Sequence, residues 1–374
     1  MSFTKYTRLF YGLSAACMMA AAVCWFTGNI NITGWVLSLS FVCIALAFRG
    51  SPVLKGMSFT AFIFASVALA MFHPGYFIQW GDFKLSGAII PLIQVLMFGM
   101  GSSMGWKDFA AIARSPKGVL IGVLSQFTIM PFLGYALAGV SGLEPEIAAG
   151  IILIGCSPSG LASNVMAYLA KANLALSVTI TSITTLIAPL VTPLLMRLLA
   201  GALVEIDVLS MMWDILKMII IPIGAGLLFN RLLKGRIQWL DDAMPFISMF
   251  SIAAIVTIIT AAGRDHLLKI GALLIVLALV HNAFGYLLGY WSGRLLRMPE
   301  KDCRTIAIEV GMQNAGLASG IAKEMGKVAT VGLAAAVFAP LMNVTGSALA
   351  SWWHNRLPKE TDADAAKEEL IHST

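Results

Sequence analysis

Residues 155–164 read Gly-Cys-Ser-Pro-Ser-Gly-Leu-Ala-Ser-Asn, and residues 309–317 read Glu-Val-Gly-Met-Gln-Asn-Ala-Gly-Leu. Each stretch is a glycine-rich, polar interruption inside a long apolar run, at about 146–170 and 304–325. Within a bilayer, backbone that leaves the helix is tolerated only where it is buried in protein or lines a cavity. The two stretches therefore predict a pair of helices that are broken inside a membrane.

The rest of the chain has the composition of a membrane protein. Of its 374 residues, 59% are hydrophobic and 12% are charged, which is about half the charged fraction of a soluble domain. A bilayer core requires roughly 20 apolar residues per helix, and the apolar runs are too long and continuous for barrel strands. The pattern predicts an all-α polytopic membrane protein. The twelve expected segments are 9–27, 33–48, 57–75, 85–105, 118–138, 146–170, 174–200, 209–229, 244–262, 270–293, 304–325 and 329–354.

The basic residues predict the orientation, because cytoplasmic loops are enriched in Lys and Arg. With the N-terminus inside, 18 of the 25 basic residues fall on the cytoplasmic side and 7 on the other. We therefore expect a multi-pass protein of the cell inner membrane, with both termini and a polar tail at 356–374 in the cytoplasm. The sequence lacks a basic stripe with interleaved aromatic residues, which would indicate nucleic-acid binding. We therefore expect these charges to flank helices in a lipid bilayer.

Segments three to seven and eight to twelve predict two halves of five helices each. Because five is an odd number, the second half must be inverted relative to the first, as is common in secondary transporters. The two broken segments occupy corresponding places in the halves. Residues 1–50 then form an extra N-terminal transmembrane hairpin. Its first segment, 9–27, is expected to be a retained helix, and a cleaved signal peptide is the alternative.

Glu309 is the strongest single indication of function. An acid in the middle of a membrane helix costs about 2.5–3.5 kcal/mol on insertion scales, so it usually faces a cavity and a partner. The alternative is a structural ion pair with Arg304. Further oxygen-bearing side chains lie in the apolar segments near the breaks: Gln126, Ser163, Asn164, Ser177, Thr181 and Gln313. Hard cations prefer such oxygen ligands, so the set predicts a sodium site.

The breaks also create half-helix N-termini, whose N–H groups and positive dipole ends suit an anion. A cation site beside them favours co-transport of sodium with an organic anion. A passive anion channel and a proton-coupled carrier stay open as alternatives. An intramembrane hydrolase that pairs Ser157 or Ser159 with His281 is a remote one, because the run 155–160 is not G-x-S-x-G. We expect no enzyme, and the five cysteines show no metal-site or disulfide spacing.

The motifs of the chain resemble those of the bile acid:sodium symporter family, over residues 51–355. The runs that carry the resemblance are Phe98-Gly99-Met100-Gly101, Gln126-Phe127, Met130-Pro131, the break at 155–164, Tyr168-Leu169-Ala170, Ala175-Leu176-Ser177-Val178, Pro189 to Pro193, His281-Asn282, Gly285-Tyr286 and Ile308 to Leu317. The resemblance implies ten helices in two inverted sets of five. It also implies a panel domain at 51–105 and 209–262, and a core domain at 117–200 and 270–355 that holds two crossed, broken helices.

The same resemblance implies the ligands of two sodium ions. One ion would bind the side chains of Ser163, Asn164, Ser177, Thr181 and Glu309. The other would bind Gln126, Glu309 and Gln313 together with the carbonyl oxygens of Val310 and Met312. The positions expected near the substrate are Leu161, Ala162, Asn314 and Asn343.

The substrate class follows from the resemblance only in outline. Members of the family carry bile acids or small organic acids, and we expect a small acid such as pantoate or ketopantoate. Bacterial relatives often have Gly-Gly-Thr where this chain has Ser159-Gly160-Leu161, so the hydroxyl lost at Leu161 changes the substrate side of the site. No obligate protein partner is expected.

Overall fold

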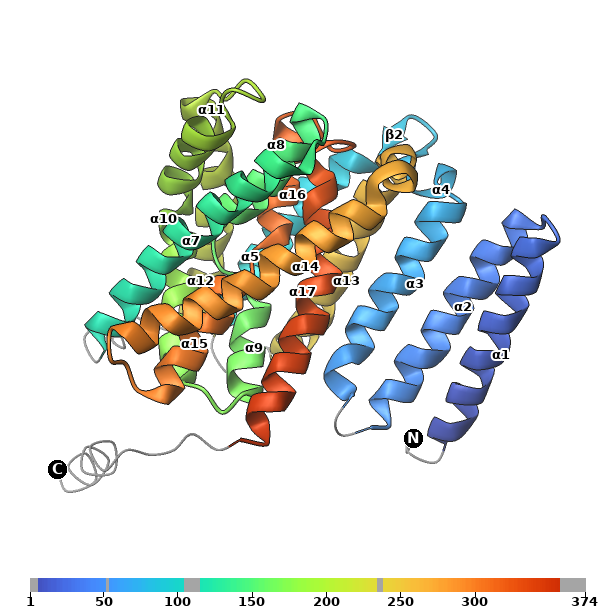
Figure 1. Cartoon of the computed structure of the whole chain (residues 1–374), viewed down its shortest axis with the longest axis horizontal. Helices are drawn as coiled ribbons and strands as arrows, with labels where there is room; N and C mark the ends of the chain where they lie inside the picture. The colour runs from blue at the N-terminus through green and yellow to red at the C-terminus, as the bar shows by residue number, and fades with distance from the viewer. Residues whose placement is uncertain (1–5, 52–53, 104–114, 234–237, 357–374) are drawn as a thin grey trace.

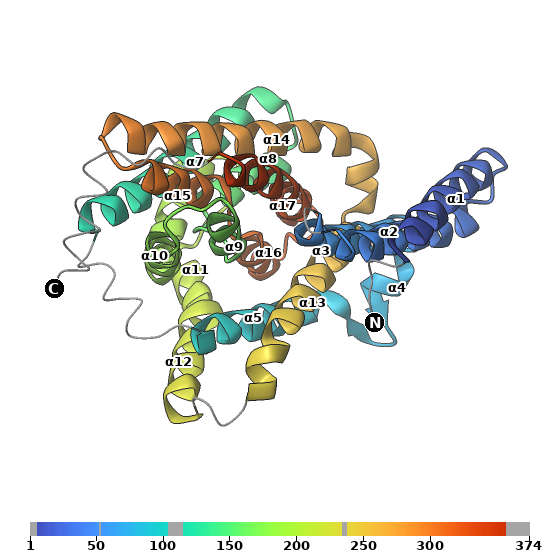
Figure 2. The same cartoon turned by 90° about the horizontal axis from the view of Figure 1, so that it is seen from below.

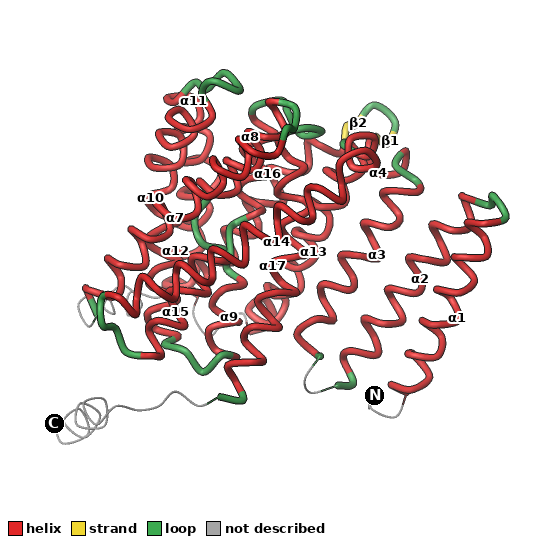
Figure 3. Tube along the Cα trace, viewed as in Figure 1, coloured by secondary structure: helices red, strands yellow, loops and turns green. Residues whose placement is uncertain are grey.

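The computed structural model describes residues 6–51, 54–103, 115–233 and 238–356, and this part of the chain is almost entirely helical (Figures 1 and 3). The described residues also include one short antiparallel β-hairpin, formed by β1 (Gln79–Trp80) and β2 (Phe83–Lys84). Helices predominate because each apolar segment satisfies its backbone hydrogen bonds internally. Among the described residues, eight helices are long and apolar enough to cross a membrane. The predicted all-α polytopic membrane fold is confirmed.

The N-terminal hairpin consists of α1 (Thr7–Phe26) and α2 (Ile30–Arg49). The two helices are joined by reciprocal hydrogen bonds, from Ser14 Oγ to the Ser40 carbonyl (3.0 Å) and from Ser40 Oγ to the Ser14 carbonyl (2.9 Å). On its other side α2 packs against α3 (Ser58–Phe72), where Ser38 donates to the Ala65 carbonyl. The three helices form a row that projects from the rest of the molecule (Figures 1 and 2).

A first group of helices begins with α3, the last helix of this row. Its other members are α5 (Ile89–Ser103), α12 (Ile221–Leu233) and α13 (Gln238–Ala262). The short helix α11 (Val208–Ile215) continues into α12 through a π-helical turn at Leu216–Ile220. The turn η2 (Lys55–Met57) precedes α3, and the connection from α3 to α5 holds α4 (Gly75–Ile78) and η3 (Leu85–Ala88). A Cβ at Gly101 would lie 2.2 Å from the Ile223 carbonyl oxygen, so glycine permits the close approach of α5 and α12.

The second group contains the broken helices. Its unbroken members are α7 (Pro116–Ser141), α10 (Leu174–Ala200), α14 (Arg264–Leu295) and α17 (Val331–His354). The segment predicted at 146–170 is two half-helices, α8 (Pro145–Cys156) and α9 (Ala162–Leu169). The segment predicted at 304–325 is likewise α15 (Glu300–Gly311) and α16 (Ala315–Glu324). Both predicted breaks are confirmed. In Figure 2 the second group lies on one side of the molecule, with α5, α12 and α13 on the other.

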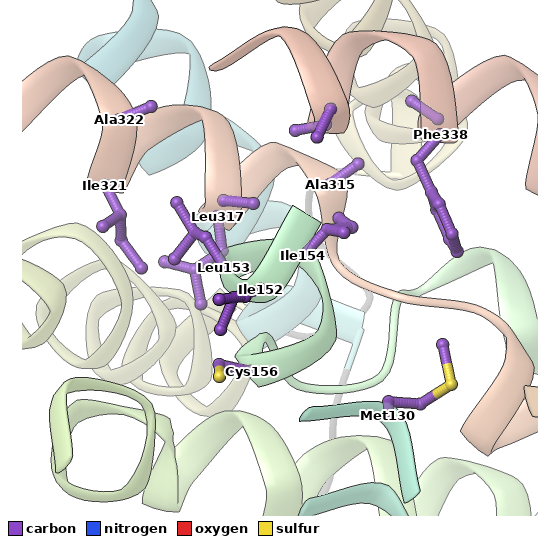
Figure 4. Close-up of a cluster of buried hydrophobic side chains, with 14 of the residues drawn as sticks. Met130, Ile152, Leu153, Ile154, Cys156, Ala315, Leu317, Ile321, Ala322 and Phe338 are labelled. Carbon is purple, nitrogen blue, oxygen red and sulfur yellow. The ribbon is translucent and has the colours of Figure 1, made fainter. Parts of the chain in front are cut away.

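The largest buried apolar cluster extends through both groups. Figure 4 shows side chains of α8 that meet those of α16 and α17, among them Leu153, Leu317 and Phe338. These three side chains are at most 1% exposed. The packing fixes each half-helix against an unbroken neighbour, although a half-helix is too short to span the bilayer alone.

The ends of several helices differ from the expected segments. For instance, α14 begins at Arg264 and α13 at Gln238, whereas the apolar runs begin at 270 and 244. The reason is that a helix continues through polar residues at the membrane surface, which a search for apolar runs leaves out. The beginning of α1 and the end of α17 lie at the same side of the molecule (Figure 1). Of the predicted tail (356–374), residues 357–374 lie outside the part of the chain that the structure describes.

Candidate functional site

The two breaks cross one another and are joined by backbone hydrogen bonds. The N–H of Gly160 donates to the Met312 carbonyl (2.8 Å), and the N–H of Asn314 donates to the Pro158 carbonyl (2.8 Å). Ser159 and Gln313 form an isolated antiparallel bridge at the centre of this crossing. Each break therefore satisfies backbone groups of the other, which is how non-helical backbone is tolerated at this depth.

Glu309 lies in α15, just before the crossing, and is fully buried. Its Oε1 accepts from Ser163 Oγ at 2.6 Å and from Ser177 Oγ at 2.5 Å. Its Oε2 accepts from Thr181 Oγ1 at 2.7 Å. The side chain of Asn164 completes the group, because its Oδ1 lies 2.8 Å from Ser177 Oγ and 3.3 Å from Thr181 Oγ1. The five predicted first-site residues are thus in mutual contact, and we call them the Glu309 cluster.

The Glu309 cluster has more hydrogen-bond acceptors than protons. A serine or threonine hydroxyl carries one proton. The proton of Ser177 has two acceptors in reach, Glu309 Oε1 and Asn164 Oδ1. The proton of Thr181 has four, namely the carboxylate, Asn164 Oδ1, the Ser177 carbonyl and Ser163 Oγ. Lone pairs are left over in a place where every member of the cluster except the half-buried Asn164 is buried. A cation among these oxygens would use them.

The alternative pairing of Glu309 with Arg304 is wrong. Arg304 Nε forms an ion pair with Glu300 Oε1 at 2.9 Å, one turn away in α15. Its other guanidinium nitrogens donate to the carbonyls of Ala170, Trp353 and Arg356. Within the described part of the chain, no basic side chain forms an ion pair with Glu309. The carboxylate is therefore surrounded by hydroxyls rather than by a compensating base.

Two buried amides lie at the crossing itself. Gln126 Nε2 donates to Gln313 Oε1 (2.6 Å) and to the Ser157 carbonyl (2.8 Å). Gln313 Nε2 in turn donates to the Val310 carbonyl (2.6 Å). Gln126 Oε1 is buried and has no hydrogen-bond partner among the described residues. Leaving a buried acceptor unsatisfied costs about 1–3 kcal/mol, so this oxygen is available to a further ligand.

Comparison with known proteins identifies the family. The sequence model of the Sodium Bile acid symporter family matches residues 90–270. The chain is 38% identical over 305 residues to an uncharacterized sodium-dependent transporter of Bacillus subtilis (strain 168), YocS, and the match covers 82% of this chain and 93% of that relative. The chain belongs to the sodium bile acid symporter family.

Two plant relatives extend the comparison. The chain is 31% identical over 270 residues to a probable sodium/metabolite cotransporter of Arabidopsis thaliana, BASS1, and the match covers 72% of this chain and 67% of the relative. It is 31% identical over 310 residues to the probable sodium/metabolite cotransporter BASS1 of Oryza sativa subsp. japonica. That match covers 81% of this chain and 74% of the relative. The relatives are named as transporters, and this family member is accordingly a membrane transporter and not an enzyme.

His281 and the two serines of the hydrolase alternative bind other partners. Its Nε2 is bound to the Met130 carbonyl at 3.0 Å. Ser157 Oγ donates to the Leu153 carbonyl, and Ser159 Oγ donates to the Glu309 carbonyl. Neither hydroxyl is hydrogen-bonded to the histidine, so the serine and histidine pair of a hydrolase is not formed.

Five further predicted residues, Val310, Met312, Leu161, Ala162 and Asn314, lie at or next to the breaks. The carbonyls of Val310 and Met312 already accept from Gln313 and Gly160, and a carbonyl oxygen has a second lone pair for a cation. Leu161 and Ala162 are half-buried at the start of α9. Asn314 Oδ1 accepts from the Leu317 N–H at 3.0 Å and so caps α16.

Asn343 is not brought into the crossing by any hydrogen bond among the described residues. Its Nδ2 donates to the Ala339 carbonyl in its own helix, and the residue is 8% exposed. Two residues at the crossing were not among the predicted ligands. Ser159 donates to the Glu309 carbonyl, and Asn282 Nδ2 donates to the Gly311 carbonyl at the end of α15 (2.6 Å). Both could have been found in the sequence, because each is a polar residue inside a predicted apolar segment.

Proposed function

We propose that this protein is a sodium-coupled symporter that moves a small organic anion by alternating access. The observation that carries the proposal is the Glu309 cluster, a buried carboxylate among hydroxyl and amide oxygens with a surplus of acceptors. The family and the names of the relatives support a sodium-dependent transporter of metabolites. A single carboxylate among neutral oxygens suits monovalent cations better than divalent ones, because it offers one negative charge.

We infer two sodium ions. The first is held by the Glu309 cluster. The second uses Gln126 Oε1, Gln313 Oε1 and Glu309, with the carbonyl oxygens of Val310 and Met312. The support for the second ion is the unsatisfied Gln126 Oε1. A second acceptor oxygen, Gln313 Oε1, lies close by, 2.6 Å from the Nε2 atom of Gln126. Both ions share Glu309, so the two sites are coupled through one side chain.

The anion is proposed to bind at the N-termini of α9 and α16, where the helix dipoles favour negative charge. The neighbouring residues are Leu161, Ala162, Asn314 and Asn343. Occupied cation sites beside these helix ends would attract the anion further and couple the two binding events. The substrate is proposed to be a small organic acid of the pantoate or ketopantoate kind rather than a bile acid.

Alternating access is proposed to move a core domain (117–200 and 270–355) against a panel domain (51–105 and 209–262). The two groups of helices described above correspond to these ranges, and the family membership supports the division. Both termini and the tail at 356–374 are proposed to be cytoplasmic, in the inner membrane. Ions and anion shift such an equilibrium only through different affinities for the two states.

The proposal is tested by the melting temperature of the purified protein with a panel of organic anions, in sodium and in potassium chloride at equal ionic strength. A ligand that binds only the folded state raises the melting temperature by mass action. We expect sodium alone to stabilise the protein, and one class of small acids to add stabilisation only in sodium. Reconstituted protein should then accumulate that acid when a sodium gradient is applied.

Other outcomes would favour the other transport classes. Uptake driven by a pH gradient, with equal stability in sodium and potassium, would indicate a proton-coupled carrier. Equilibration of the acid without accumulation would indicate a passive channel. Either result would overturn the sodium-coupled proposal.

The substitution Asn314→Asp should separate the anion from the cation. The aspartate keeps an oxygen that caps α16, but it adds a negative charge where the anion is proposed to bind. We expect uptake and anion-dependent stabilisation to be lost, while sodium still stabilises the variant when no anion is present. Asn314→Ser, which also caps a helix, is the control and should retain anion binding. An unchanged anion affinity in Asn314→Asp would place the anion elsewhere.

A further inference from the structure

The α9–α10 loop (170–173) connects the two helices that carry Ser163, Asn164, Ser177 and Thr181. It is short and closely hydrogen-bonded, with Lys171 in the left-handed region (φ 53°) and the Ala172 N–H bound to the Ala167 carbonyl. The last residue of the loop, Asn173, caps α10, because its Oδ1 accepts from the Leu176 N–H at 3.1 Å. The position of this loop therefore affects both helices of the cluster.

The start of α15 contacts this loop at several points. Asn173 Nδ2 donates to Asp302 Oδ1 at 2.8 Å. The N–H of Asn173 donates to Thr305 Oγ1 (2.9 Å), and Thr305 Oγ1 lies 3.1 Å from the Asn173 carbonyl. Arg304 donates to the Ala170 carbonyl. Asp302 and Thr305 are 7% and 0% exposed, whereas Asn173 is half-buried.

The contacts have the same register as the Glu309 cluster. Asn173 precedes Ser177 by one helical turn in the same chain direction, and the Ser177 N–H is bound to the Asn173 carbonyl. Thr305 precedes Glu309 by one turn of α15. The pair Asn173–Thr305 is thus followed, one turn deeper, by the pair Ser177–Glu309, whose oxygens lie 2.5 Å apart.

We propose that Asn173 and Asp302 are positioning residues for the cation site. Their hydrogen bond sets how α10 and the α9–α10 loop lie along α15, and so sets the distance from the hydroxyls to the Glu309 carboxylate. Binding sites require their ligands within about 0.5 Å of the productive geometry, and a small slip of α10 along α15 exceeds that tolerance. The inference rests on the proposed sodium site but adds residues that touch no ion.

The test exchanges the two polar groups. Asn173→Asp places two carboxylates within hydrogen-bond distance, and their repulsion separates the helix ends. Asp302→Asn alone leaves an amide that can still accept through its Oδ1. The double variant Asn173→Asp with Asp302→Asn restores one donor and one acceptor in reversed order, and the aspartate introduced by Asn173→Asp would still cap α10.

The readout is the sodium midpoint of thermal stabilisation for the full-length protein, with the melting temperature in potassium as a second measurement. Loss of groups that orient metal ligands typically costs about 10–100-fold in metal affinity. We expect Asn173→Asp to raise the sodium midpoint at least about tenfold, and the double variant to return it to within about threefold of the original protein.

A matched control lies at the opposite end of the broken helices. Glu146, in the first turn of α8, binds Lys327 Nζ and accepts from Thr330 Oγ1 at 2.6 Å. Glu146→Gln weakens a polar contact at the opposite end of the broken helix from the α9–α10 loop, and it should lower the melting temperature in both salts without changing the sodium midpoint.

The outcomes separate the two proposals. If the unaltered protein shows no sodium stabilisation, the sodium site fails and the positioning role fails with it. If the protein responds to sodium but Asn173→Asp keeps its midpoint, or the double variant does not recover, the positioning role alone is wrong. A fall in melting temperature with an unchanged midpoint would likewise show a purely structural contact.

Discussion

Glu309→Gln is expected to abolish sodium-dependent stabilisation and sodium-driven uptake while the protein still folds. The amide has nearly the shape of the carboxylate. Its oxygen can still accept from Ser163, while its NH2 group can donate to Thr181 Oγ1, whose own proton can go to the Ser177 carbonyl. It lacks the negative charge, and Glu309 has no ion pair with a basic side chain among the described residues. Removing the charge therefore leaves no uncompensated base behind, whereas it removes the one charged ligand of both proposed ions.

The size of the effect follows from that charge. Hydrogen bonds and contacts to an ionised group contribute about 1.5–3 kcal/mol each, which corresponds to a loss of sodium affinity of at least about tenfold per contact. The measurement is the melting temperature over a sodium titration, followed by uptake in vesicles. Glu324→Gln is the control, because Glu324 is exposed at the end of α16. Wild-type sodium dependence in Glu309→Gln would remove Glu309 from the site.

Gly160→Ala is expected to have the other large effect, by separating the crossed breaks. A Cβ at Gly160 would lie 2.5 Å from the Gln313 carbonyl oxygen and 3.0 Å from its carbonyl carbon. These are backbone atoms, which cannot rotate away as a side chain can. The two breaks must therefore move apart, and the hydrogen bond from the Gly160 N–H to the Met312 carbonyl (2.8 Å) must lengthen.

Forced overpacking of this kind costs about 1–3 kcal/mol and occasionally more. We expect a melting temperature that is lower by several degrees and loss of sodium-driven uptake, because the Gln126 and Gln313 amides lie at the displaced crossing. Gly139→Ala in α7 is the matched control. A Cβ there meets nothing within 4 Å, so alanine should leave stability unchanged or raise it slightly. Full uptake by Gly160→Ala would show that the crossing tolerates separation.

Much of the candidate site could be predicted because its residue types are unusual for their surroundings. Glu309, Gln126 and Gln313 interrupt apolar runs, and an interruption of that kind requires a partner or a ligand. The sequence could not distinguish the Arg304 ion pair from a cation site, because both residues lie on the same helix. It also left Ser159 and Asn282 out of the site, since a hydroxyl or amide in a membrane helix often only packs between helices.

Features that depend on neighbouring residues in the chain can be predicted from the sequence. The length of each apolar run predicts the membrane helices, and the glycine-rich polar stretches at 155–164 and 309–317 predict where two of them break. Which oxygens meet depends on tertiary packing. Ser163 and Glu309 are 146 residues apart, and Gln126 and Gln313 are 187 apart. These contacts depend on how the two crossed helices pack against each other and against α7, because a hydrogen bond requires atoms to lie within about 3 Å. Local sequence preferences carry no such distance.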